Sequence, residues 1–246
     1  MIPKKLYFTY AHDEPPELYI WNMKRWATHC SDWEIHYFSD QKIFLFFKEN
    51  LPEYYPKLFQ IPLGVVLADI FRYAVLYIQG GMYMDIDTIP LKPIPDEWLQ
   101  YDLVVGYELQ PSKFPMTPAG KDGYEEVFCQ WALLARSKHP LFKELLDQCF
   151  SALHARDYEV QTMRDVLEIC GPIQFTKAMH QYQNSPRTLL LDMDVFASTE
   201  QYLPPTERSV IKHQFHGHLG WQLALEAKHL KLNSIKGRNP KLTAHN

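Results

Sequence analysis

The chain has 246 residues, of which 46% are apolar and 22% are charged, and its formal net charge is −4. These values are typical of soluble globular proteins and exclude disordered, fibrous and collagen-like chains. The negative net charge gives no general attraction to nucleic acid, so no nucleic-acid partner is expected. The 4 cysteines are far apart and form no CxxC pair, which favours reduced thiols in a core over a zinc or disulfide framework.

The first forty residues predict a β–α–β unit. Lys5–Tyr10 and Glu34–Phe38 are rich in β-forming residues, and Glu17–His29 lies between them with helical apolar spacing. The apolar positions that define this helix are Leu18, Trp21, Trp26 and Cys30. The unit favours an α/β fold whose sheet is at least partly parallel.

A buried helix and a short acidic strand are predicted next. Leu63–Gln79 is apolar on most faces and stops at Gly80-Gly81, which is typical of a buried helix with a glycine end. Residues Met82–Asp87 are then predicted to form a strand. The prolines at 90, 93 and 95 exclude regular structure directly after it.

The remaining elements follow from the same patterns, and no linker divides the chain, so a single domain over residues 1–246 is expected. The predicted strands are Leu103–Tyr107, Leu189–Leu191 and Val210–Phe215, and the predicted helices are Glu125–Arg136, Leu141–His154 and Pro172–Gln183. The loop Glu108–Gly123 is long enough to suggest a role beside the substrate. From about residue 228 the chain becomes basic, and we expect a solvated, flexible tail.

No membrane-spanning segment is expected. The longest apolar-rich stretch, Leu63–Ile78, is interrupted by Asp69 and Arg72, and no long apolar run follows the first residues. A soluble, cytoplasmic protein is therefore predicted.

Two acidic residues in the predicted strand suggest a metal site. Side chains repeat with a period of two along a strand, so Asp85 and Asp87 would share a face at roughly 7 Å between Cα atoms. Paired carboxylates suit Mg²⁺ or Mn²⁺, which proteins often hold together with substrate phosphates. A lone DxD triplet is also frequent as a solvated pair in a turn.

The preceding helix carries an isolated pair of charges. Asp69 and Arg72 lie at positions i and i+3, on one face, and are the only charged residues in Leu63–Ile78. They could form a structural ion pair, or they could present a carboxylate and a forked donor to ligand hydroxyls or phosphate.

Together these residues resemble a known signature. The segments are Ala68–Tyr73, Leu76-Tyr77, Gly80–Tyr83 and Asp85–Thr88. They resemble the DXD sugar transferases of glycosyltransferase family 32, relatives of the yeast initiating mannosyltransferases and of the clostridial glucosylating toxins. The resemblance extends to Ile2–Lys4, Phe38–Asp40, Gly171-Pro172 with Thr176, and His216 with Trp221.

The resemblance implies a GT-A type nucleotide-sugar-binding fold, with a mixed, mostly parallel central sheet flanked by helices. It implies a metal-dependent transferase that moves a hexose from a UDP- or GDP-sugar with retention of anomeric configuration. The implied cofactor is Mn²⁺, with Mg²⁺ as an alternative. The acceptor would be a glycan, a lipid-linked molecule or a protein.

The resemblance also implies roles for the matching residues. Asp87 would bind the metal, and Asp85 would contact the ribose or donor sugar and reach the metal through water. Asp69 and Arg72 would hold donor-sugar hydroxyls. These four are the predicted catalytic residues.

Three aromatic residues complete the predicted donor site. Tyr83 follows the double glycine, and Tyr10 stands where the family usually has a Trp near the nucleobase, a position at which Tyr can still stack. Trp221 could pack in the core or cover the donor phosphates.

The closing motif leaves the third metal ligand open. The family usually has a His pair followed by Gly-Ser-Trp, whereas here the segment from His213 to Trp221 contains His216 and His218. In a strand these two histidines share a face that His213 does not. His216 is preferred over His218 because it has the family's five-residue offset to Trp221.

Two other functions fit parts of this pattern. Asp85–Thr88 also matches the DxDxT motif of haloacid-dehalogenase-type phosphatases, with Asp85 as nucleophile, Asp87 as acid/base and Asp192–Asp194 as a second acidic site. That motif is expected after a first strand, without a buried Asp–Arg helix before it. A sugar-nucleotide-binding module without turnover fits less well, because all four predicted catalytic residues are present.

Overall fold

The computed structural model describes residues 1–114, 126–196, 203–216, 220, 221, 223 and 225. The strands are β1 (Lys5–Thr9), β2 (Glu34–Phe38), β3 (Gly81–Met84), β4 (Thr88–Pro90), β5 (Leu103–Leu109), β6 (Val127–Ala135), β7 (Thr188–Leu191) and β8 (Ile211–His213). The helices are α1 (Glu17–His29), α2 (Asp40–Asn50), α3 (Tyr55–Leu58), α4 (Gly64–Gln79), the 3₁₀ helix η1 (Asp96–Gln100), α5 (Pro140–His154), α6 (Met163–Ile169), α7 (Pro172–Met179) and α8 (Met193–Phe196). The predicted tail from about residue 228 lies outside the described residues.

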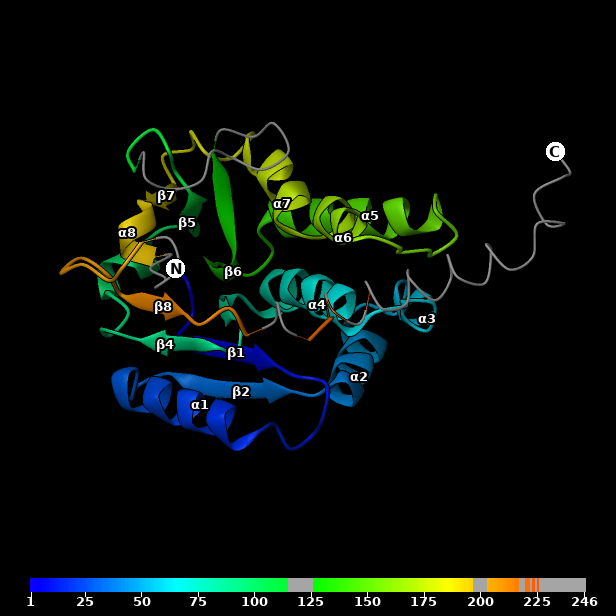
Figure 1. The fold of residues 1–246 in the computed structure, drawn as a ribbon, viewed down its shortest axis with the longest axis horizontal. Helices are drawn as coiled ribbons and strands as arrows, with labels where there is room; N and C mark the ends of the chain where they lie inside the picture. Colours follow the sequence, from blue (N-terminus) through cyan, green and yellow to red (C-terminus); the bar gives the residue numbers. More distant parts are fainter. Residues whose placement is uncertain (115–125, 197–202, 217–219, 222, 224, 226–246) are drawn as a thin grey trace, which may run out of the picture.

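A six-stranded sheet in the order β2-β1-β3-β6-β5-β7 forms the centre of the protein, and a two-stranded sheet of β4 and β8 lies beside it (Figure 1). In the large sheet β1 pairs in parallel with β2 and β3, and β5 pairs in parallel with β7. Strand β6 runs antiparallel to both of its neighbours, β3 and β5. The predicted α/β class with a mixed, mostly parallel sheet is therefore confirmed.

Helices cover both faces of the large sheet, because its strands alternate apolar side chains between two cores. In β1, Tyr7 packs into the core formed with α2, α4, α5, α6 and α7. Leu6 and Phe8 pack into the opposite core, with α1, η1 and α8. The sheet is thus buried on both sides, and its strand ends are the natural place for a site.

Helix α4 has the form that the sequence predicted. Ten of its residues from Val66 to Leu76 are buried, and the backbone N–H of Gly80 donates to the carbonyl of Leu76 at the helix end. Gly80 has a φ of 66°, and a Cβ there would lie 2.5 Å from the backbone nitrogen of Ser137. Only glycine fits this left-handed, crowded position, which explains the sharp stop.

Residues Glu125–Arg136 were predicted as a helix, and this was wrong. The described part of this range forms β6, whose residues from Val127 to Ala135 are all buried between β3 and β5. A central strand covered on both faces has a continuous apolar sequence without alternation, so its periodicity cannot be distinguished from that of a buried helix.

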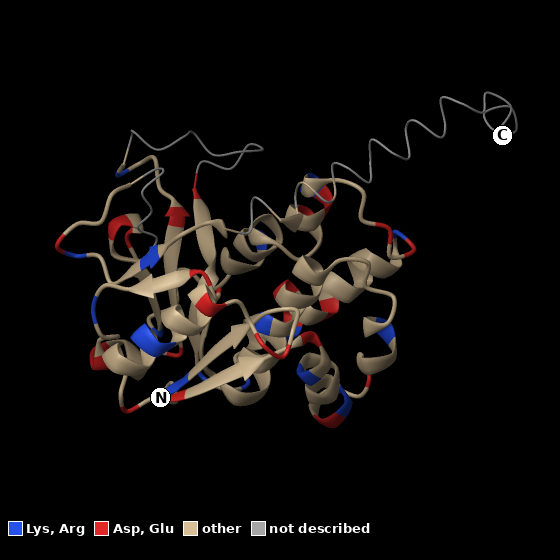
Figure 2. Ribbon diagram, turned by 60° about the horizontal axis from the view of Figure 1, so that its bottom comes forward, with Lys and Arg blue, Asp and Glu red and all other residues tan. Residues whose placement is uncertain are grey.

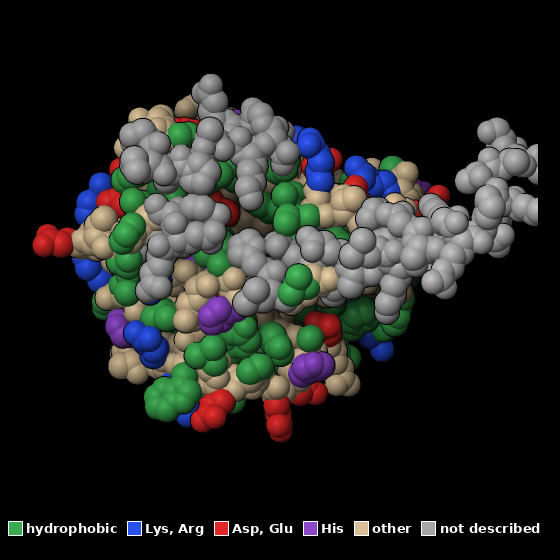
Figure 3. Space-filling view, in the orientation of Figure 1, with side chains coloured by type: hydrophobic (Ala, Val, Ile, Leu, Met, Phe, Trp, Pro, Cys, Tyr) green, Lys and Arg blue, Asp and Glu red, His purple; other side chains and the backbone are tan. Residues whose placement is uncertain are grey.

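Two further predictions of local structure need correction. The strand expected over Met82–Asp87 ends at Met84, and the chain turns before entering β4, which includes Pro90 although regular structure was excluded there. In α1, Leu18 and Trp21 were expected on the apolar face but are 49% and 59% exposed. Apolar side chains are accordingly visible at the surface over α1 at the lower edge of Figure 3.

The charges and thiols follow the sequence expectations. Over the elements that the structure describes, Lys and Arg are interspersed with Asp and Glu and form no basic stripe (Figure 2). All 4 cysteines are buried and free, as expected for core thiols. Within the described ranges, no helix is long and apolar enough to cross a membrane.

Candidate active site

A cavity of about 570 Å³ opens at the carboxyl ends of β1 and β3. It is lined by the described members of the predicted site, Tyr10, Asp69, Arg72, Tyr83, Asp85, Asp87, His216 and Trp221. His218 lies outside the described residues. The fold therefore gathers in one cavity residues that are more than 200 positions apart in the sequence.

The two aspartates of the DXD motif occupy a turn and not a strand. The carbonyl of Asp85 accepts hydrogen bonds from the backbone N–H of Thr88 at 3.2 Å and from its hydroxyl at 2.8 Å. The N–H of Asp85 donates to the carbonyl of Trp131 on β6 at 2.8 Å. This four-residue turn, anchored to the sheet, brings the carboxylates of Asp85 and Asp87 together.

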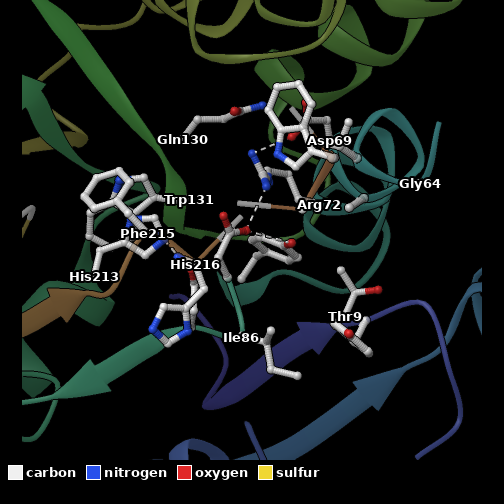
Figure 4. Close-up of a pocket in the computed structure, with 18 of the residues that line it drawn as sticks. Thr9, Gly64, Asp69, Arg72, Ile86, Gln130, Trp131, His213, Phe215 and His216 are labelled. Carbon is white, nitrogen blue, oxygen red and sulfur yellow. Dashed lines mark hydrogen bonds and ion pairs between the residues drawn. The ribbon is translucent and has the colours of Figure 1, made fainter. Parts of the chain in front are cut away.

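Arg72 links the acidic groups of the site. Its Nη1 lies 2.9 Å from Oδ1 of Asp69, and its Nη2 lies 2.8 Å from Oδ1 of Asp85 (Figure 4). The guanidinium also lies over the ring of Tyr83, 4.8 Å from its centroid, and the Tyr83 hydroxyl donates to Asp85 at 3.0 Å. The predicted i, i+3 pair is therefore present, and Arg72 extends it to the DXD turn.

Burial and charge set the protonation of these carboxyl groups. Burial raises the pKa of the Asp69 carboxyl to about 7, against the opposing effect of Arg72. Burial also raises the pKa of Asp85, again opposed by Arg72. Burial also raises the pKa of Asp87, but the hydrogen bond and the charge of His213 lower it by more. The pKa of Asp87 therefore lies below its ordinary value. Asp87 is thus held as the anion of the site.

The segment after β8 wraps around Asp87. Nε2 of His213 lies 2.9 Å from Oδ1 of Asp87, and the backbone N–H of His216 donates to Oδ2 at 2.8 Å. The backbone N–H of Gln214 donates to the Asp87 carbonyl at 3.0 Å. Phe215 has a φ of 54°, the left-handed region that is unusual for a bulky residue, and this bend lets both neighbours reach Asp87.

The histidine side chain beside the two aspartates is that of His213. One ligand atom each from Asp85, Asp87 and His213 lie within 4.8 Å of one another. The ring of His216 packs instead near Tyr19, with centroids 6.1 Å apart. A strand that continued to Phe215 would have placed His213 on the opposite face from His216 and His218. Strand β8 ends at His213 instead, so side-chain alternation does not apply to the residues after it. The assignment of His216 as a ligand stays a prediction, and His213 is its competitor.

Two aromatic rings hold His213 in place. Its imidazole stacks on Trp131, with centroids 4.5 Å apart and planes at 17°, and Phe215 lies on it at 4.0 Å. Figure 4 shows His213 between these two rings. Trp131 was not singled out from the sequence, because its strand was interpreted as a helix.

Gln130 and Cys170 surround Asp69 and were also missed. The amide of Gln130 donates to the Tyr73 hydroxyl at 2.6 Å and to the Cys170 carbonyl at 2.8 Å. The thiol of Cys170 donates to Oδ2 of Asp69 at 3.4 Å. A glutamine within the otherwise apolar sequence of β6 was the available signal, since a buried amide needs partners.

The aromatic members of the predicted donor site lie at the cavity wall. Tyr10 packs near Tyr19, with ring centroids 5.4 Å apart, at the ends of β1 and β2. Trp221 borders the cavity and also packs against the core on the α4 side of the sheet. It therefore packs in the core beside the cavity, and a role over the donor phosphates stays a prediction.

The second acidic site of the phosphatase alternative lies elsewhere. Asp192 pairs with Lys113 and Arg208, and Asp194 pairs with Arg208. Neither aspartate lines the cavity that holds Asp85 and Asp87. The structure thus does not bring together the residues that a dehalogenase-type site would need.

The sequence is similar to proteins of known class. The family described as "Glycosyltransferase sugar-binding region containing DXD motif" matches residues 16–105. This segment contains Asp69, Arg72, Asp85 and Asp87. This segment is similar to the DXD glycosyltransferase family. The resemblance inferred from the sequence is thereby confirmed over this segment.

Individual proteins are also similar to this chain. The chain is 27% identical over 211 residues to the initiation-specific alpha-1,6-mannosyltransferase of Candida albicans, covering 76% of this chain and 53% of that protein. It is 36% identical over 137 residues to the enzyme of the same name in Schizosaccharomyces pombe, covering 50% of this chain and 33% of that protein. The chain thus spans about half, or less, of the length of these relatives. Among solved structures, the PaToxG glycosyltransferase is similar with a TM-score of 0.47 and 19% identity, covering 74% of this chain and 70% of that one.

Proposed function

We propose that this protein transfers a hexose from a UDP- or GDP-sugar, with retention of configuration, to a glycan, a lipid-linked molecule or a protein. The observation that carries the proposal is the cluster of Asp85, Asp87 and His213, with ligand atoms within 4.8 Å of one another. Arg72 connects this cluster to the buried Asp69 across the same cavity.

The residues of this cluster fit a divalent cation. Two carboxylates and one imidazole form a donor set that suits Mn²⁺. Mg²⁺ prefers oxygen ligands and would be held mainly by the two carboxylates. Nε2 of His213 lies 2.9 Å from Oδ1 of Asp87, so it would bind a cation as an unprotonated nitrogen only where the cation replaces that hydrogen bond. Nδ1, which is buried without a hydrogen-bond partner among the described residues, would then carry the proton. Bound here, Mn²⁺ would neutralise charge on the departing nucleoside diphosphate.

The residues beside the cluster would act on the donor sugar. Asp69 and Arg72 are both 4% exposed and reach the cavity from α4. In so dry a place, hydrogen bonds to sugar hydroxyls are strong and hold the anomeric carbon in one orientation. Tyr10, which also lines the cavity, would stack on the nucleobase. Asp85 would contact the ribose or the donor sugar.

Mannose is the first hexose to test, because both curated relatives are named alpha-1,6-mannosyltransferases. The acceptor and the cytoplasmic location expected from the sequence stay predictions. A single domain over residues 1–246 is likewise a prediction.

The experiment is a screen of UDP- and GDP-hexoses with and without Mn²⁺, with free nucleotide as the readout. We expect metal-dependent hydrolysis of one nucleotide sugar, Mn²⁺ to be more effective than Ca²⁺, and loss of activity with chelator. Asp87→Asn should reduce this hydrolysis at least about 100-fold, the effect of removing one transition-state stabiliser. Full activity of Asp87→Asn in chelator would contradict the metal-dependent function.

Two other results would replace the proposal. Release of phosphate from a simple phosphomonoester, without nucleotide-sugar hydrolysis, would indicate a phosphatase. Binding of a nucleotide sugar without turnover at any metal concentration would indicate a binding module.

A further inference from the structure

Helix α1 contributes a buried amide to the DXD turn that the proposed chemistry does not use. Asn22 is 2% exposed, and it is the buried polar residue of α1. Its Nδ2 donates to the carbonyl of Ile86, between the two aspartates, at 3.1 Å. The same nitrogen donates to Oε1 of Gln214 at 3.0 Å. One side chain therefore uses both of its N–H groups to join two segments that are 128 residues apart.

Each of these two segments determines the position of Asp87. Ile86 precedes it in the turn, and Gln214 donates its own backbone N–H to the Asp87 carbonyl at 3.0 Å. His213 and His216, on either side of Gln214, bind the two carboxylate oxygens of Asp87. Asn22 thus joins Ile86 to Gln214, and Gln214 in turn contacts Asp87, the residue after Ile86.

The segment that Asn22 holds needs such an anchor. Phe215 stays in the left-handed region at a φ of 54°, a conformation that costs free energy for a bulky residue and persists only where the surroundings enforce it. Trp26, one helical turn after Asn22, also donates to the DXD segment, from Nε1 to the Thr88 carbonyl at 3.2 Å. Helix α1 therefore binds the turn at two points, and it reaches the 213–216 segment through the hydrogen bond of Asn22 to Gln214 and through the ring of Tyr19 beside His216.

We propose that Asn22 is a positioning residue, which fixes the DXD turn and residues 213–216 in one arrangement around Asp87. The part of this proposal that concerns the metal rests on the proposed function. Because the candidate ligands come from both segments, a change in their relative position would separate Asp85 and Asp87 from His213. Outer residues that orient ligands in this way typically change metal affinity about 10- to 100-fold.

The test uses two variants and a matched control in the full chain. Asn22→Leu has a similar volume and removes both donors. Gln214→Leu removes only the Oε1 acceptor of the Asn22 hydrogen bond. Because Gln214 is partly exposed, this variant replaces Asn22→Leu in the test if Asn22→Leu does not fold. Asn50→Leu is the control, because Asn50 donates to Phe46 within α2 and does not line the cavity.

Amide hydrogen exchange, measured without metal, tests the positioning itself. We expect faster exchange at the N–H groups of Gln214 and His216 in Asn22→Leu and in Gln214→Leu, with no change at β1 amides. Asn50→Leu should leave all of these amides unchanged. Unchanged protection at residues 214 and 216 in both variants would overturn the proposal.

Mn²⁺ titration then tests the consequence. We expect Asn22→Leu to lower Mn²⁺ affinity at least about tenfold, and the double variant with Gln214→Leu to fall little further, because both residues act through one contact. A merely structural role would lower the stability of the fold and leave the Mn²⁺ affinity of the folded protein unchanged, which would also overturn the proposal. If the unaltered protein bound no Mn²⁺ while the exchange pattern held, the metal-dependent function would fail and the positioning role of Asn22 would stand.

Discussion

Arg72 shows how much one side chain can determine in this site. Its guanidinium reaches Asp69 and Asp85 at the same time, and its side chain is only 5% exposed. A planar fork with several N–H groups can bind two carboxylates in fixed directions, whereas a lysine ammonium is a single point charge. The pair at i and i+3 is therefore more than a local helix contact, since it orients the first aspartate of the DXD motif.

Substitution of this pair should affect the sugar more than the nucleotide. We expect Arg72→Lys and Asp69→Asn to reduce donor hydrolysis about 100-fold, since each removes a contact to the reacting sugar. The affinity for free nucleotide should change by less than about threefold, because neither residue is assigned to the diphosphate. Calorimetric titration with nucleotide and with nucleotide sugar measures the difference. Equal loss of both affinities, or unfolding, would instead identify a buried structural pair.

The identity of the histidine ligand is a second question at this scale. We expect His213→Ala to weaken Mn²⁺ binding at least about tenfold, since its ring lies with Asp85 and Asp87. The His216→Ala variant should bind Mn²⁺ almost normally, because it keeps the backbone N–H that donates a hydrogen bond to Asp87. Titration of these two variants and of His218→Ala under one set of conditions distinguishes the three residues. Loss of Mn²⁺ binding in His216→Ala alone would support the assignment from the offset to Trp221.

At the scale of elements, the start of α5 contains a buried base. His139 precedes the helix and packs against Phe142 and Tyr182, with ring centroids 6.0 and 5.2 Å away. Burial lowers the pKa of its imidazole to about 4, and the nearby Arg136 adds to this effect. The folded protein therefore keeps His139 neutral at a pH where the unfolded chain would protonate it.

The stability of the fold should consequently fall in acid. Between the ordinary pKa of 6.5 and about 4 the unfolded state binds more protons at His139 than the folded state, so the free energy of unfolding decreases as the pH falls through this range. The contribution amounts to at most about 3 kcal/mol. Denaturant unfolding at pH 7 and pH 4.5 measures it, with His139→Gln as the comparison. The unaltered protein should lose more stability than the variant, and equal losses would show that His139 does not cause the effect.

At the scale of the whole molecule, the site is assembled from distant segments. One cavity is bordered by the end of β1, helix α4, the DXD turn, β6, residues 213–216 and residues 220 and 221. No single element contains enough of these groups to bind a donor. Any ligand that bridges them should therefore stabilise the folded chain as a whole.

Metal and nucleotide together should raise the melting temperature. At concentrations of about 100 times Kd the stabilisation is about 2.7 kcal/mol, which for a domain of this size corresponds to roughly 5 to 10 °C. Differential scanning calorimetry with Mn²⁺ and nucleotide measures this shift, and chelator should reverse it. Asp87→Asn should show no metal-dependent shift, and Asn50→Leu should show the full shift. A shift that survives in Asp87→Asn would indicate that the cation binds elsewhere.

Local patterns in the sequence were sufficient for much of the fold. The bounds of α1 are the predicted ones, α4 differs by one residue, and the glycine pair ends α4 where expected. These features depend on interactions between near neighbours, such as helical periodicity and the conformational freedom of Gly80. The contact between Asp69 and Arg72 was predictable for the same reason, since their spacing places them on one helix face.

The tertiary structure decided the rest. Strand β6 could not be identified, because burial on both faces removes the alternation that marks a strand. The contact of His213 with Asp87 joins residues 126 positions apart and depends on the pairing of β8 with β4, which sets Thr88 opposite His213. The bend at Phe215 and the buried amide of Asn22 depend in turn on that packing. The sequence by itself thus determined which residues are candidates for the site, whereas the partners of those residues required long-range pairing that no local pattern encodes.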